Sequence, residues 1–150
     1  MGSIILLNNM VVMGRSKRTA TVADSTMVAE WFAMSMAAHD TMFLRQLLES
    51  MGFPQDNASQ HLGDNQGALA QVRNPGCGRA KHVYVKLNWM AEQVKLNKLA
   101  FAYCPTKEMI ADIMTKQLAV GTQNALRSSV LVNSDGKVIE EECCAASAAE

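Results

Sequence analysis

The N-terminal residues alternate between short apolar runs and turn-forming positions. Residues 3–7 predict a strand, and residues 10–13 predict its return after the pair Asn8-Asn9. Asparagine tolerates the positive φ angles of a tight hairpin turn. A basic stretch over 14–18 follows, and residues 19–23 are rich in the β-branched side chains that are typical of strands. The pattern therefore predicts a hairpin and then a third strand.

A long helix is predicted next. One of residues 24–26 can cap its first turn, and the helix is expected to run to about Met51, before Pro54. On a helical wheel its apolar side chains form an arc that includes Met34, Ala37, Leu44 and Leu48. Glu30 falls on the same arc. It is either an N-terminal acid that favours the helix dipole or a functional group, and both alternatives stay open.

The second half of the chain predicts further helices and strands. Strands are expected over 60–63 and 99–103, and helices are expected over 65–72, 81–97 and 105–118, the last of them capped by Thr106. The complete order is β-β-β-α-β-α-α-β-α. It predicts one α/β domain, with a mixed sheet and helices on its faces.

The charge of the chain is unevenly distributed. The chain carries 14 basic and 14 acidic residues, and the segment 135–150 contains five of the acids but one Lys. The Ala-rich segment 131–150 is therefore expected to be a disordered tail, and the mildly basic remainder permits a nucleic-acid partner. Four Cys without a C-x-x-C pair argue against zinc and favour a reducing compartment. Without an apolar run of roughly 20 residues, we expect no membrane association and a cytoplasmic or nuclear location.

Three carboxylates occur on three separate predicted elements: Glu30, Asp64 and Asp112. Each has an ordinary alternative. An Asp before a helix is most often a cap, and Asp112 has the i, i+4, i+8 spacing of a charge-paired face with Glu108 and Lys116. Together, however, a strand end and two helices can bring three acids over one sheet, where oxygen ligands suit Mg²⁺ or Mn²⁺. Two such ions about 4 Å apart can activate a water in phosphodiester cleavage.

These acids belong to a series of short motifs. In chain order the motifs are Ser16-Lys17-Arg18, Thr21-Val22-Ala23-Asp24-Ser25-Thr26-Met27, Ala29-Glu30-Trp31, Leu44-Arg45-Gln46-Leu47-Leu48, Gly63-Asp64-Asn65-Gln66-Gly67-Ala68, Lys81-His82-Val83 and Ala111-Asp112-Ile113-Met114-Thr115-Lys116. Each motif alone is loose, but their order is specific. Over about residues 3–130 they resemble the ribonuclease H domain at the end of copia-type retrotransposon Pol polyproteins.

The resemblance implies a ribonuclease H fold, which is a mixed sheet flanked by helices, and metal-dependent cleavage of RNA in RNA–DNA hybrids. It also implies that Glu30, Asp64 and Asp112 are catalytic ligands of Mg²⁺ or Mn²⁺ ions. The family's fourth acid lies on a first, central strand, and this chain begins after that strand, with no acid before Asp24. We therefore expect residues 3–130 to form a partial domain without its central strand, and the isolated chain to be inactive. Unpaired strand edges would invite a partner.

Two alternatives to an inactive remnant stay open. One is an active nuclease that is completed by an upstream segment of a polyprotein, such as its reverse transcriptase portion, or by a partner chain. The other is a non-catalytic binder of an RNA–DNA hybrid or another nucleic acid, in which Trp89 or Tyr84 would stack on a base.

Contacts to the nucleic-acid backbone would come from basic and polar residues, namely Arg15, Lys17, Arg18, Asn65, Gln66, Arg79, Lys81, His82 and Lys86. The plainer interpretation is a solvated basic face and core aromatics. No His lies close to Asp112 in sequence, so no catalytic His is expected.

Overall fold

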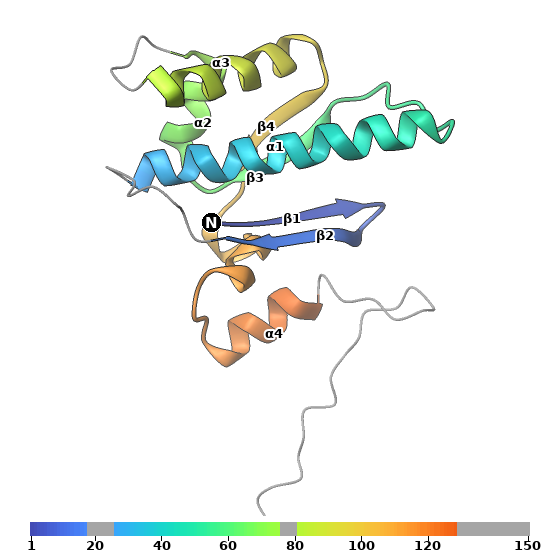
Figure 1. The fold of residues 1–150 in the computed structure, drawn as a ribbon. Coiled ribbons are helices and arrows are strands. Elements are labelled where there is room, and N and C mark those ends of the chain that lie inside the picture. Colours follow the sequence, from blue (N-terminus) through green and yellow to red (C-terminus); the bar gives the residue numbers. More distant parts are fainter. Residues whose placement is uncertain (18–25, 76–80, 129–150) are drawn as a thin grey trace, which may run out of the picture.

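The computed structural model describes residues 1–17, 26–75 and 81–128 (Figure 1). In chain order its elements are β1 (Gly2–Leu7), β2 (Met10–Ser16), α1 (Thr26–Ser50), β3 (Ser59–Gly63), α2 (Gln66–Arg73), α3 (Lys81–Lys95), β4 (Leu99–Tyr103), the two short 3-10 helices η1 (Thr106–Glu108) and η2 (Ile110–Met114), and α4 (Val120–Ser128). The mixture of helices and strands confirms the α/β class. The strand expected over 19–23 and the tail over 131–150 lie outside the described residues.

The predicted hairpin is confirmed. β1 and β2 pair antiparallel around Asn8 and Asn9, whose φ angles of 52° and 62° are those that asparagine tolerates. β2 extends three residues beyond the predicted strand. It does so because Ser16 pairs with Gly2 and donates its hydroxyl proton to the carbonyl oxygen of Met114, at 2.9 Å.

A second small sheet is formed by β3 and β4. These strands pair in parallel, with Ser59 opposite Leu99 and Gly63 opposite Tyr103, and α2 and α3 connect them. The expected single mixed sheet is not formed by the described strands, because β1–β2 and β3–β4 are not hydrogen-bonded to each other. Each of β1 and β3 therefore has one edge that pairs with no described strand.

The buried core lies between α1, α2, α3 and the β3–β4 sheet. Its fully or nearly fully buried apolar side chains are Ala38, Leu69, Val72, Leu87, Met90, Leu99 and Phe101. Four of these seven side chains lie on α3 and on β4, the strand that was predicted over 99–103. No helix within the described ranges is long and apolar enough to cross a bilayer.

The long helix α1 is apolar on two faces. One face contributes Ala38 to the core, with Phe32 and Met42 packed against it. The predicted arc lies on the neighbouring face and lines a cavity between β1 and β3; its members are Met34, which also packs against the core, Ala37, Leu44 and Leu48. Figure 1 shows the β1–β2 hairpin running alongside α1. The helix thus presents apolar side chains to a space that no described element fills.

The prediction of one helix over 105–118 is wrong. The chain instead forms η1 and η2, whose amides bond three residues back, as from Asp112 to the carbonyl of Met109. An extended residue, Met109, separates the two turns. The second turn packs closely on β1, where a Cβ on Gly2 would lie 2.6 Å from the Thr115 methyl. Only glycine permits this approach, and α4 then follows as a helix that the sequence pattern did not predict.

Candidate metal centre

Three acids from three elements line one cavity. Glu30 lies in α1 just past its first turn, Asp64 directly follows β3, and Asp112 lies in η2. The cavity has a volume of about 790 Å³ and is bordered by α1, β1, β3 and the η1–η2 segment. Both Asp64 and Asp112 act electrostatically on Glu30. The structure therefore brings the three predicted acids to the same end of the cavity.

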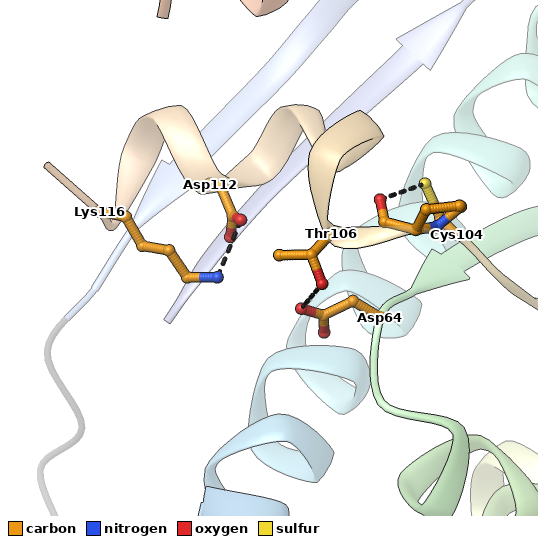
Figure 2. A network of polar contacts seen from close by, with 6 residues as sticks. Asp64, Cys104, Thr106, Asp112 and Lys116 are labelled. Atoms are coloured by element: carbon orange, nitrogen blue, oxygen red, sulfur yellow. Dashed lines mark hydrogen bonds and ion pairs between the residues drawn. The ribbon is translucent and has the colours of Figure 1, made fainter. Parts of the chain in front are cut away.

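Asp64 does not cap the helix that follows it. The cap of α2 is Asn65, whose side-chain oxygen accepts the amide proton of Ala68 at 3.0 Å. The carboxylate of Asp64 is left to accept the hydroxyl proton of Thr106, at 3.5 Å (Figure 2). The prediction that Thr106 caps a helix is also wrong. Its hydroxyl donates to Asp64 and makes no capping hydrogen bond.

Asp112 is buried, with 8% of its surface exposed, and forms an ion pair. The ammonium of Lys116 lies 2.8 Å from its carboxylate (Figure 2). The predicted i, i+4 pairing is thus confirmed for these two residues. The pKa of Lys116 is raised, first by its hydrogen bond to Asp112 and further by the charges of Asp112, Asp64 and Glu30. Lys116 is therefore a member of the site. The sequence analysis placed it only on a charge-paired face, although its position four residues after Asp112 already indicated that the two could pair.

Glu30 is held in an environment that disfavours its charge. Its pKa is raised, chiefly by burial and then by the negative charge of Asp64 and of Asp112, while Lys116 and the N-terminal amine oppose the shift. No acid lies in the first turn of α1, so the interpretation of Glu30 as a helix-dipole acid is wrong. Burying a carboxylate beside two others costs free energy.

The charge of the three carboxylates suits a divalent cation, but their present arrangement does not. Three carboxylates face two positive groups, the ammonium of Lys116 and the N-terminal amine, so the centre keeps an excess of negative charge that a cation would relieve. In the described part of the chain, however, no three Asp, Glu, His or Cys side chains lie close enough together to hold a metal ion. Lys116 supplies the positive charge instead. A metal ion would have to displace this ammonium from Asp112.

The electrostatics of Glu30 lead to a stability prediction. In the presence of a chelator at pH 7, Glu30→Gln is expected to raise the midpoint of thermal unfolding, because it removes a buried charge next to two like charges. The raised pKa gives the sign: the folded state binds the proton more tightly than the unfolded state, so ionising Glu30 above its ordinary pKa destabilises the fold. Glu49→Gln, at an exposed position of the same helix, should leave the midpoint unchanged. A lower midpoint for Glu30→Gln would contradict the prediction.

Some residues of the predicted nucleic-acid surface have partners within the chain. Arg15 pairs with Asp40 at 3.2 Å, which joins β2 to α1. The ammonium of Lys86 lies 5.5 Å from the ring centre of Phe32. Lys17 is exposed. Two of the three described cations thus contribute to the fold itself.

Two further residues of this surface lie at the start of α2. Asn65 caps α2, as described above, and Gln66 is the first residue of that helix. Trp89 stacks on His39 with ring centres 3.9 Å apart, so one face of its ring is already covered. Outside the described residues lie Arg18, Arg79 and the side chains of Lys81 and His82.

Comparison with known proteins relates the chain to retrotransposon polyproteins. It is 28% identical over 116 residues to the retrovirus-related Pol polyprotein from transposon TNT 1-94 of Nicotiana tabacum, covering 77% of this chain and 9% of that protein. It is 27% identical over 128 residues to the Pol polyprotein from transposon RE2 of Arabidopsis thaliana, covering 84% of this chain and 9% of that protein.

A yeast relative gives a similar result. The transposon Ty1-DR1 Gag-Pol polyprotein of Saccharomyces cerevisiae is 28% identical over 123 residues, covering 81% of this chain and 7% of the relative. No family model matches the chain, and no solved structure matches it significantly. The chain spans less than a tenth of each of these relatives. Over most of its length the chain is thus similar to one segment of retrotransposon Pol polyproteins.

Proposed function

We propose that the chain is a ribonuclease H-like domain whose ancestral reaction is metal-dependent hydrolysis of RNA in RNA–DNA hybrids, and that it is inactive in isolation. One observation carries the proposal: Glu30, Asp64 and Asp112, which the sequence motifs single out, line the same cavity from three elements. The similarity to Pol polyproteins supports the same origin. The proposed partner is an RNA–DNA hybrid, and the proposed cofactor is Mg²⁺ or Mn²⁺.

The chemistry of the proposed site follows from its acids. A bound divalent ion would lower the pKa of a coordinated water and stabilise the leaving oxygen. Glu30, Asp64 and Asp112 would hold the ion, and relief of their mutual repulsion would favour its binding. The Thr106 hydroxyl would keep Asp64 oriented. Such an orienting hydrogen bond is a common support for a metal ligand.

Two features explain why we expect the isolated chain to be inactive. The ammonium of Lys116 already neutralises Asp112, so a divalent ion must compete with an internal cation. In addition, the described residues provide three carboxylates but no three-ligand geometry. Weak binding of the ion and a misplaced water are the expected results.

The test uses the full chain with a labelled RNA–DNA hybrid and Mn²⁺. We expect no more turnover from the wild-type chain than from Asp64→Asn. Turnover that Asp64→Asn abolishes would contradict the proposed inactivity and establish a nuclease.

Binding of Mn²⁺ provides a second measurement, by titration calorimetry. Lys116→Met is expected to tighten binding about fivefold, since it removes a competing ion pair worth about 1 kcal/mol. Lys107→Met, which removes an exposed ammonium outside the cavity, is the control and should leave the affinity unchanged. Equal affinities for all three proteins would contradict a metal centre that includes Asp112.

A further inference from the structure

We propose that the cavity holds a second site, at the end away from the three acids, which binds an unbranched carboxylate with an apolar tail. Two polar side chains of α1, Thr41 and Arg45, carry the proposal. Both line the cavity, and both are more than nine-tenths buried, with 8% and 5% of their surfaces exposed. Residues four apart are neighbours on one face of a helix. The hydroxyl and the guanidinium can therefore contact the same bound group.

The guanidinium of Arg45 is a buried charge without a counterion. It donates to the carbonyl oxygens of Gln55 and Asn57 and to the hydroxyl of Ser59. These bonds use both protons of Nη1 and one of Nη2. A guanidinium has five N–H donors, so one on Nε and one on Nη2 remain. No carboxylate pairs with Arg45 in the part of the chain that the structure describes. Buried charges are usually paired, and a bound carboxylate would supply the missing partner.

The hydroxyl of Thr41 is the second group without a partner. Thr41 lies within the apolar arc of α1, between Ala37 and Leu44. Among the described residues no atom forms a hydrogen bond with its hydroxyl. A buried hydroxyl that makes no hydrogen bond costs free energy, and most such groups in proteins are bonded. A carboxylate oxygen held by Arg45 would accept this proton as well.

The two ends of the cavity carry opposite charge. β3 connects them, because it begins with Ser59, which is bonded to Arg45, and is followed by Asp64, which acts on Glu30. Along α1, Arg45 lies about 22 Å from Glu30, at a rise of 1.5 Å per residue. The carboxylates of the acidic end would repel an anion. This arrangement directs the head of the ligand to Arg45 and its tail toward the middle of the cavity.

The space between the two ends suits an apolar tail. It is lined by Ile5 of β1 and by the arc of α1, and the whole cavity of about 790 Å³ falls within the usual range of ligand pockets. An extended chain advances about 3.5 Å for every three bonds, so decanoate spans about 12 Å. Its tail would therefore end in the apolar part, short of the acids. A carboxylate of about this length is the ligand class that the cavity fits.

The test measures binding of decanoate to the full chain in a chelator, by titration calorimetry. We expect saturable binding at one site. Decan-1-ol has the same tail without the charge and should bind at least about tenfold more weakly. Octanoate lacks two methylenes and should also bind roughly tenfold more weakly. Equal affinities for decanoate and decan-1-ol would overturn the proposal, because the head would then not be recognised.

Thr41→Val tests the head contact in the protein. Valine keeps the shape of threonine and removes the hydroxyl, so decanoate should bind about tenfold more weakly. The midpoint of thermal unfolding should not fall, because the hydroxyl has no partner to lose. Thr122→Val, at an exposed position of α4 outside the cavity, is the matched control and should leave the affinity unchanged. Unchanged decanoate affinity in Thr41→Val would refute the site. The comparison of decanoate with decan-1-ol on the wild-type chain does not depend on how the variant folds.

A further variant separates this site from the metal centre. The proposed carboxylate site uses none of the three acids, so it does not rest on the proposed function. Asp64→Asn, which lies at the other end of the cavity, should bind decanoate as tightly as the wild-type chain. Decanoate that binds at least about tenfold more tightly to Asp64→Asn would place its head beside the acids and overturn a site at Arg45. The outcome of the cleavage assay leaves either result unaffected.

Discussion

Replacing Arg45 by methionine is expected to lower the free energy of unfolding by about 3 kcal/mol. Arg45 is buried in α1, with 5% of its surface exposed. It donates to the carbonyl oxygens of Gln55 and Asn57 and to the hydroxyl of Ser59, the last two at 2.8 and 2.9 Å. No carboxylate pairs with it in the described part of the chain. These three bonds fix the loop that leads into β3.

Methionine keeps the apolar stem of the side chain and removes the donors, so three acceptors lose their partner. Denaturant unfolding, followed by circular dichroism, measures the change. Gln46→Met, at the exposed neighbouring position, is the control and should change stability by less than about 0.5 kcal/mol. A similarly small effect of Arg45→Met would show that the loop is held by other contacts.

Acidification from pH 6.5 to pH 4 is expected to cost the fold up to about 3 kcal/mol through His61 alone. His61 lies in β3 with its ring 5.1 Å from the ring of Phe101. Burial lowers its pKa to about 4, from an ordinary value of 6.5. Within this window the unfolded chain binds the proton and the folded chain does not. Stability is therefore complete above pH 6.5 and is lost as the pH falls toward 4.

The variant His61→Gln isolates this contribution. Gln cannot titrate, so the difference in unfolding free energy between wild type and variant should shrink steadily between pH 6.5 and pH 4. Gln60→Ala, at the adjacent exposed residue of β3, should change stability by the same amount at every pH. If the difference between wild type and His61→Gln is independent of pH, the imidazole is hydrated in the folded state and the prediction is wrong.

Local sequence signals were sufficient for the elements that the chain forms by itself. The Asn8-Asn9 turn, the long helix and the strands β3 and β4 all lie close to their predicted bounds, because turn chemistry and apolar periodicity decide them. The three acids were identified from the same signals together with the motifs. The predicted apolar arc was correct as a pattern, but it faces a cavity, and a wheel cannot tell a filled neighbour from an empty one.

Features that depend on contacts between distant segments were missed. Two adjacent residues, Asp64 and Asn65, could both cap α2, and only the fold shows that Asn65 does so. The predicted C-terminal helix became two 3-10 helices, and the second of them packs against Gly2, more than 100 residues away in sequence. The position of Lys116 among three carboxylates depends on that same packing. The spacing of apolar residues within 105–118 does not encode this packing.

The ammonium of Lys116 has a consequence for how this chain persists. Clusters of acids often make a protein depend on metal for its stability, so a chelator unfolds it. Here the polypeptide carries its own counterion on a flexible tether, next to the most deeply buried of the three acids. The fold is therefore expected to need no metal ion for its stability. A domain built in this way can lose its chemistry and still retain its shape.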